Sequence, residues 1–296
     1  MQQTEASMTA KICAFTRAYH SKFASNKVYD DYLAYEMIGE KEFELIKDML
    51  DKMMKKQDFQ LSESTWDRAL DEFVSPIILS RIKYTETCLK KYVEDSNEIQ
   101  YVNCGAGMDS FAFRNTDKRI QIFELDHPNT HHYKLNRIKQ LEWLIPNNVH
   151  HISIDFDKQN MMESLIEAGF QPAKKTFFAI LGVTYYLELE SFAKIIRDMS
   201  QLTDNESIVV LDYPDSNLFD HELGRMKILK NLTNRLGEEM KGVMSREELT
   251  KVFGINGFTI IESQDAKEIQ NNLLNNSSLK AYQNVNFITA KKEKEI

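Results

Sequence analysis

Two glycines and a carboxylate stand where an adenosine-bearing cofactor could bind. Gly105 and Gly107 follow a short apolar run, and glycine lets a backbone turn approach a ligand with no Cβ in the way. Asp126 ends the next apolar run, where a carboxylate suits the two hydroxyls of a ribose. If the strand register is shifted by two residues, Glu124 takes its place on the same strand face.

The residue three positions after the second glycine bears on which cofactor fits. Dinucleotide-binding proteins carry Gly-x-Gly-x-x-Gly, whose third glycine allows close helix packing under a pyrophosphate. Position 110 of this chain is Ser110, so that pattern is incomplete. S-adenosylmethionine has no pyrophosphate and needs only the tight turn. The glycine spacing leaves both cofactors open, and an ordinary strand-to-helix turn would look the same.

Composition argues against several classes of protein. A formal net charge of −8 disfavours binding to nucleic acid or to an anionic membrane. The three cysteines are far apart with no CxxC pair, which argues against a disulfide framework or a zinc site and for a reducing cytoplasm. No apolar run approaches the roughly 20 residues of a membrane span, and the first residues lack a signal-peptide pattern. We therefore expect a cytoplasmic protein without a metal, nucleic-acid or membrane partner.

The apolar pattern changes along the chain from helical spacing to an alternation of strands and helices. Residues 1–92 read as an N-terminal helical cap, in which Pro76 is expected to break or kink the helix at 69–79. Residues 93–296 read as an α/β core with right-handed crossovers and a parallel sheet. The expected strands are 99–103, 120–125, 149–154, 176–181, 207–213, 258–263 and 284–290.

Two further features shape the expected fold. The last two strands are separated by the polar, Asn-rich stretch 266–280 rather than a long amphipathic helix, so the final strand is expected to be antiparallel, at or near the sheet edge. This ending favours the class I methyltransferase version of the doubly wound, Rossmann-like α/β fold over the dehydrogenase version. Residues 215–253 are expected to form a helical insertion placed where a lid could form.

Several segments, in the right order, resemble the leucine carboxyl methyltransferase-like family, whose members use S-adenosylmethionine. The most specific is Phe-Glu-Leu-Asp-His-Pro at 123–128, and the glycine turn is similar to the family's Gly-Ala-Gly-x-Asp-(Thr/Ser). The resemblance covers most of the chain and implies S-adenosylmethionine as the cofactor. The similar segments are 8–18, 28–34, 80–86, 102–114, 123–128, 150–156 and 182–187.

The resemblance implies a role for each matching position. Gly105 and Gly107 would pass beneath the methionine part of the cofactor, and Arg81 would pair with its carboxylate. A guanidinium suits that task because its planar fork gives two parallel charge-assisted bonds. Asp126 would accept bonds from the ribose hydroxyls.

The family also implies contacts to the adenine and to the amino group. Asp155 would accept from the adenine amino group, and the amide of Phe156 would meet a ring nitrogen. Leu181 stands where many members have an acidic residue, so its carbonyl and that of Gly182 would hold the cofactor's amino group instead. This departure indicates a divergent branch, and the leucine-carboxylate substrate of the founding enzymes is therefore not carried over.

Methyl transfer from a sulfonium needs alignment at about 3–3.5 Å more than activation. A carboxylate acceptor requires no base at neutral pH, whereas a hydroxyl or phenol benefits from one. We expect an O-methyltransferase that acts on a carboxylate of a small molecule, with no catalytic residue assigned. The alternatives are an NAD-dependent oxidoreductase and a non-catalytic cofactor-binding module.

The expected acceptor site lies between the cap and the carboxyl ends of the strands. Arg17 could bind an acidic acceptor from the cap, and Tyr186 and Tyr213 lie near strand ends. Asp212 and His221 are candidates for a base if the acceptor is a hydroxyl.

Overall fold

The computed structural model describes residues 6–56, 66–156, 158–203, 206–215 and 225–293. Five helices come first: α1 (Met8–Phe23), α2 (Ala34–Ile38), α3 (Glu40–Lys56), α4 (Trp66–Phe73) and α5 (Ser75–Glu94). The side chain of Ser7 accepts from the amide of Ala10 and caps the start of α1. Pro76 lies in the first turn of α5, where its missing N–H costs nothing, so the expected break is confirmed as the boundary between α4 and α5.

The strands within the described residues form one seven-stranded sheet in the order β3-β2-β1-β4-β5-β7-β6. The pairs among the first five strands are parallel, and β7 is antiparallel to both of its neighbours. The predicted class I methyltransferase sheet, with an antiparallel last strand near the edge, is therefore confirmed. The strands are β1 (Ile99–Cys104), β2 (Ile120–Asp126), β3 (Val149–Ser153), β4 (Thr176–Ile180), β5 (Ile208–Pro214), β6 (Phe258–Gln264) and β7 (Val285–Lys292).

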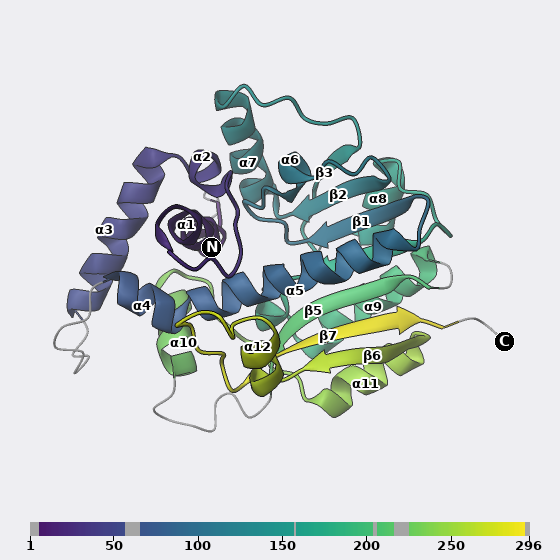
Figure 1. Cartoon of the computed structure of the whole chain (residues 1–296). Coiled ribbons are helices and arrows are strands. Elements are labelled where there is room, and N and C mark those ends of the chain that lie inside the picture. Colours follow the sequence, from purple (N-terminus) through teal and green to yellow (C-terminus); the bar gives the residue numbers. More distant parts are fainter. Residues whose placement is uncertain (1–5, 57–65, 157, 204–205, 216–224, 294–296) are drawn as a thin grey trace.

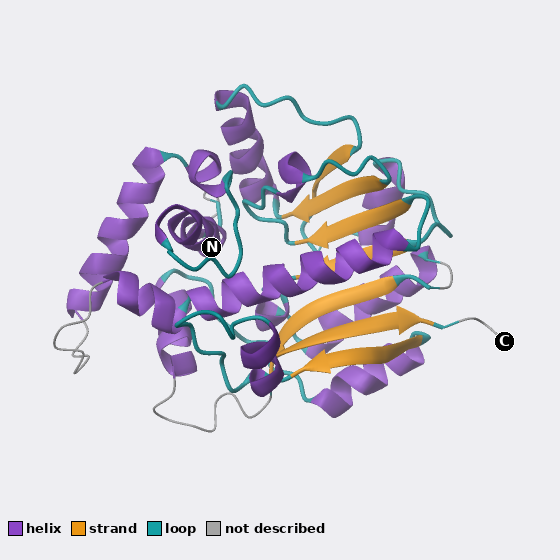
Figure 2. Cartoon of the chain, viewed as in Figure 1, coloured by secondary structure: helices purple, strands orange, loops and turns teal. Residues whose placement is uncertain are grey.

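Helices cover the two faces of this sheet, as Figures 1 and 2 show. The crossover helices are α6 (Phe111–Arg114), α7 (Pro128–Gln140), α8 (Met161–Glu167) and α9 (Leu189–Leu202). Successive side chains of a strand point to opposite faces, so Phe177 packs with the α5 side of the core and Phe178 with the α8 and α9 side. The cap is not detached from this core, because α5 also contacts β4 and β5. The expected division between residues 92 and 93 stays a prediction.

The two helices of the segment expected as an insertion pack against different parts of the molecule. α10 (Arg225–Arg235) contacts α4 and joins the cap, whereas α11 (Arg246–Ile255) packs on β6 and α9. α12 (Ala266–Asn272) is a short helix in the polar, Asn-rich stretch for which the sequence predicted no long amphipathic helix. A capping box between Asp265 and Glu268 stabilises the start of this helix. The helix has only seven residues, which is too short to show an apolar period in the sequence.

The carboxyl ends of the parallel strands point toward α1, α4 and α10, on the left in Figure 1. This edge of an open α/β sheet is where ligands bind, because loops and helix starts diverge there. Of the helices that the structure describes, none is both long and apolar enough to cross a membrane.

Candidate active site

A cleft of about 500 Å³ opens at this edge of the sheet, between the strand ends, α1 and the loop after α10. It collects most of the residues that the sequence singled out. Those that line it are Arg17, Arg81, Gly105, Gly107, Asp126, Phe156, Leu181 and Tyr186.

The glycine turn after β1 forms the floor of the cleft. Gly105 has a φ of +78° and donates its N–H to the carbonyl of Leu125 at 2.8 Å. A Cβ at this position would overlap the side chain of Val183, so only glycine fits both the backbone conformation and the space. The amide of Ala106 donates to the same carbonyl at 3.1 Å, and that of Gly107 donates to the Asp126 carboxylate. The turn is thus fixed against the end of β2.

Asp126 is a carboxylate held by backbone amides at the rim of the cleft. One oxygen accepts from Gly107, and the other accepts from the N–H of His127 at 2.7 Å. Burial raises the pKa of the Asp126 carboxyl to about 6, although both backbone bonds oppose the shift. A carboxyl with this pKa is ionised at neutral pH and can still accept from a hydroxyl pair.

Glu124 lies on the same strand face but serves a different purpose. Its carboxylate accepts from Lys134 Nζ at 2.6 Å and lies 3.0 Å from Nδ1 of His151, and only 3% of its side chain is exposed. Burial alone would raise the pKa of Glu124, but Lys134 and His151 lower it to about 2. The register therefore places Asp126 at the cleft and Glu124 in a buried ion pair behind it.

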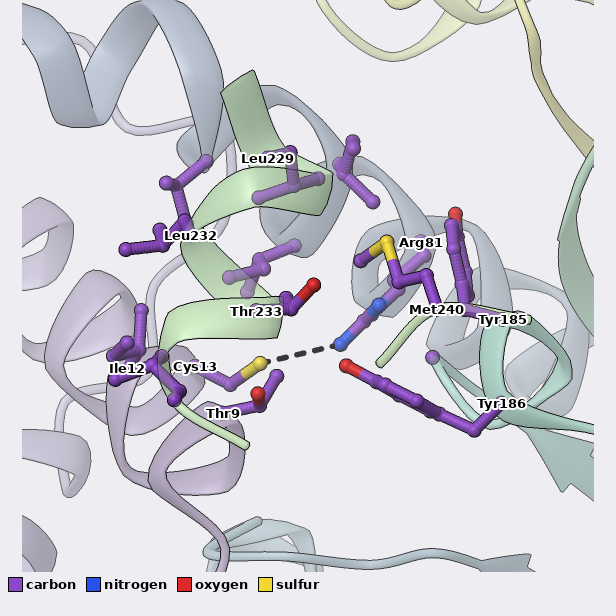
Figure 3. Close-up of a pocket in the computed structure, with 15 residues that line it drawn as sticks. Thr9, Ile12, Cys13, Arg81, Tyr185, Tyr186, Leu229, Leu232, Thr233 and Met240 are labelled. Atoms are coloured by element: carbon purple, nitrogen blue, oxygen red, sulfur yellow. Dashed lines mark hydrogen bonds between the residues drawn. The ribbon is translucent and has the colours of Figure 1, made fainter. Parts of the chain in front are cut away.

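Arg81 reaches the other end of the cleft from α5. Its Nη1 lies 3.4 Å from Oδ2 of Asp212, and its Nη2 donates to Sγ of Cys13 at 3.3 Å (Figure 3). Burial alone would lower the pKa of the guanidinium, but Asp212, together with Cys13, Tyr185 and Tyr186, shifts it upward overall. Its Nε has no hydrogen-bond partner among the described residues, which leaves a buried donor for a ligand.

Asp212 and Gly182 hold Arg81 in place. Gly182 donates its N–H to Oδ1 of Asp212 at 2.7 Å, and a Cβ on Gly182 would overlap the Arg81 guanidinium. Asp212 is fully buried and does not line the described cavities. The residue that the sequence offered as a base is therefore the partner that orients Arg81.

A second cavity of about 310 Å³ continues the cleft past the end of β3. Asp155 lines it, and Phe156 lines both cavities. Oδ2 of Asp155 accepts from Lys158 Nζ at 2.7 Å. Across the sheet, the predicted cofactor residues thus follow the strand order β4, β1, β2, β3, with Arg81 over the end of β4 and Asp155 beyond the end of β3.

A third, smaller chamber of about 60 Å³ opens beside Arg81, between α1, α5 and α10 (Figure 3). It shares residues with the large cleft, so the two spaces meet there. The shared residues are Thr9, Cys13, Arg81, Gly182 and Tyr186. In Figure 3 the hydroxyl of Tyr186 points toward Thr9 and Cys13, and burial raises its pKa above the ordinary value. Tyr186 therefore lies at the junction of the two spaces, and its role toward the acceptor stays a prediction.

Arg17 lies in the wall of the cleft, and two of its nitrogens already donate to groups of the protein. Its Nε donates to Oδ2 of Asp31 at 2.9 Å and its Nη2 to the carbonyl of Met108 at 2.6 Å, with 4% of the side chain exposed. It ties α1 to the glycine turn, and its role toward an acidic acceptor stays a prediction.

Tyr213 is not brought to the cavities with the other predicted residues. It is buried in β5 opposite Asn286 of β7, and it does not line the three cavities described. Its substrate role stays a prediction, and His221 lies outside the described residues.

One residue of the cleft had no signal in the sequence. Glu238, from the loop after α10, accepts from the amide of Met8 at 2.8 Å and from the hydroxyl of Ser7 at 3.0 Å. It lines the cleft together with the start of α1. The partners are about 230 residues apart, so no local pattern could have paired them.

Within the described part of the chain, the histidines are not grouped as metal ligands would be. No group of three His, Cys, Asp or Glu side chains suited to a metal occurs within the described ranges. His127 instead caps the start of α7, where Nδ1 accepts from the amide of Asn129.

Comparisons with known proteins agree with this geometry. The family model for leucine carboxyl methyltransferase matches residues 10–200. YktD of Bacillus subtilis (strain 168), which is named as an S-adenosyl-L-methionine-dependent methyltransferase, is 31% identical over 311 positions that span 99% of this chain and 100% of that protein. A similarly named protein of Parafrankia sp. (strain EAN1pec) is 26% identical over 49% of this chain and 46% of its own length.

Among solved structures, a DUF574 family protein from Streptomyces avermitilis superposes with a TM-score of 0.59. The match covers 98% of each chain at 10% sequence identity, and so concerns the fold alone. The predicted family, fold and cofactor are confirmed, and none of these similarities supports the NAD-dependent alternative. The chain therefore belongs to the leucine carboxyl methyltransferase family and is an S-adenosylmethionine-dependent methyltransferase.

Proposed function

We propose that this methyltransferase transfers the methyl group to a carboxylate oxygen of a small molecule. The cofactor would lie along the strand ends, with its adenine toward Asp155, its ribose on Asp126 and its methionine carboxylate on Arg81. In that orientation the methyl group is near the junction at Tyr186, between the cleft and the small chamber.

The single observation that carries the carboxylate is the lining of the small chamber. Among the described residues that line it, none is His, Asp or Glu. Tyr185 and Tyr186 also line the chamber, and a tyrosine acts as a base only when its hydroxyl has lost its proton. Burial raises the pKa of both, so both hydroxyls keep their protons and neither can take one from an acceptor. An acceptor that is already an anion needs no base. A hydroxyl acceptor would find no His, Asp or Glu base among the described residues that line this chamber.

The charges of the reaction fit this site. The carboxylate oxygen forms a bond to the methyl carbon while the bond between that carbon and sulfur breaks. The electron pair of the broken bond stays on sulfur. A carboxylate and a sulfonium thus become a neutral ester and a thioether. The sulfonium attracts the acceptor, and a mainly apolar chamber favours the loss of charge. The protein contributes alignment and exclusion of water.

A labelled-methyl assay tests the proposal. The purified protein is incubated with methyl-labelled S-adenosylmethionine and matched pairs of small carboxylic acids and the corresponding alcohols. We expect label in the acids, released as methanol by mild alkali because it is held in an ester. Label held only in alkali-stable ethers would contradict the carboxylate proposal.

A further inference from the structure

The small chamber beside Arg81 has the character of a pocket for a hydrocarbon group. Arg81 is the one charged residue among the described side chains that line it, and most of the others are aliphatic. They come from α1, α5, α10 and the 3₁₀ helix η1 (Thr184–Tyr186), together with Met240 (Figure 3). The enclosed space is on the side of the junction away from the glycine turn, which lines only the cleft.

One face of α10 forms a wall of this chamber. Leu229, Leu232 and Thr233 of α10 and Leu236, the residue that follows its end, recur at the spacing i, i+3, i+4, i+7. The amide of Leu236 still donates to the carbonyl of Leu232 at 3.2 Å, so the four side chains share one side. Leu229 and Leu236 also pack against the hydrophobic core. Leu232 is half-buried and lines the chamber, so it can be changed with less effect on folding.

The volume sets the size of group that fits. An apolar cavity of about 150 Å³ holds a benzene molecule, so the 60 Å³ here correspond to roughly two or three carbon atoms. Truncating Leu232 to alanine would remove three carbons from the wall and add about that much room.

We propose that the chamber binds the apolar group of the acceptor and that Leu232 sets the permitted length of that group. This inference rests on the proposed carboxylate methylation and adds a substrate class to it: short-chain aliphatic carboxylic acids. The carboxylate would remain at the junction near Tyr186, and the hydrocarbon end would stop against α10.

A chain-length series tests the proposal. The kcat/KM for methyl transfer is measured for straight-chain alkanoic acids from acetate to octanoate. We expect an optimum at a short acid, and a Leu232→Ala variant should move it by two to three carbons toward longer acids. Each carbon newly accommodated should raise kcat/KM about fourfold. Leu232→Phe should move the optimum toward shorter acids, which keeps the test valid if one variant is poorly folded.

Ile228→Ala is the matched control, because Ile228 lies on the same helix and packs against the cap core without lining the chamber. Its chain-length profile should equal that of the parent protein. The inference would be overturned if the optimal chain length were unchanged in both Leu232 variants, or if it shifted equally in Ile228→Ala. Neither result would contradict carboxylate methylation.

Calorimetric binding of the same acids, with S-adenosylhomocysteine present, separates the two proposals. Binding with a Leu232-dependent length preference but no methyl transfer supports the chamber and contradicts the proposed function. An absence of binding at every length contradicts the chamber.

Discussion

The cofactor side and the acceptor side of this site are built in different ways. The cofactor side consists of the ends of four neighbouring parallel strands and the turns that follow them, so its residues are fixed by the sheet. The acceptor side consists of helix faces from α1, α5 and α10, which are far apart in the sequence. If the cofactor and the acceptor bind as proposed, the sheet determines where the cofactor lies, whereas helix packing determines the shape offered to the acceptor. The helix faces on the acceptor side can therefore change without disturbing the strand ends on the cofactor side.

The largest expected effect concerns the buried charges that join the two sides. Asp31 is fully buried and pairs with Arg17, whereas the neighbouring Asp30 forms an exposed pair with Lys27. Asp31→Asn leaves Arg17 partly unpaired in the interior and should lower the free energy of unfolding by about 3–5 kcal/mol. Asp30→Asn should cost less than about 1 kcal/mol. Urea denaturation measures both, and equal losses would mean that the cap is not anchored through Asp31.

The next effect tests the cofactor side alone. Asp126→Ala should weaken binding of S-adenosylhomocysteine by about 1.5–3 kcal/mol, since it removes an acceptor of charge-assisted bonds from the ribose. Isothermal titration calorimetry gives the dissociation constant. Leu232→Ala, on the acceptor side, should leave that constant unchanged. Equal weakening by both variants would abolish the distinction between the two sides.

The pKa of Asp126 adds a pH dependence to the cofactor side. Because that pKa is about 6, the carboxylate that would accept from the ribose in the proposed complex is lost as the pH falls below 6. The affinity for S-adenosylhomocysteine should fall about tenfold between pH 7.5 and pH 5. In Asp126→Asn, titration calorimetry across this range should show a flatter profile. An equally steep profile in that variant would assign the dependence to another group.

The same carboxyl affects the unliganded protein with the opposite sign. Its folded-state pKa lies above the ordinary value of 3.8, so the folded state binds the proton more tightly. The stability that this proton contributes is fully present below about pH 4 and is lost as the pH rises through about 6.

The smallest expected effect concerns the contact between α1 and the loop after α10. Glu238→Ala removes the carboxylate that accepts hydrogen bonds from the amide of Met8 and the hydroxyl of Ser7. This should destabilise the start of α1 by about 1 kcal/mol. Hydrogen exchange of the first turn of α1 should therefore be faster. The exposed neighbour Glu239 provides the control, and Glu239→Ala should leave exchange unchanged. Unaltered exchange in Glu238→Ala would mean that this contact does not fasten α1.

The sequence could predict the cofactor side because its signals are local. A strand followed by a glycine turn, and a strand that ends in an acid, each lie within one short stretch, and both were found at the cleft as Gly105 and Asp126. The acceptor side had no such signal. That α10 joins the cap, that Glu238 meets Met8, and that Asp212 lies under Arg81 all depend on packing between distant segments. Residues that come into contact only in the folded protein have no fixed spacing in the sequence from which the contact could be predicted.

A crystal structure of the protein with S-adenosylhomocysteine tests the whole arrangement most directly. We expect the ribose hydroxyls within hydrogen-bond distance of Asp126, the homocysteine carboxylate on Arg81, and the sulfur facing the chamber beside Tyr186. A nucleoside bound away from Asp126, or a sulfur turned away from the chamber, would contradict the account.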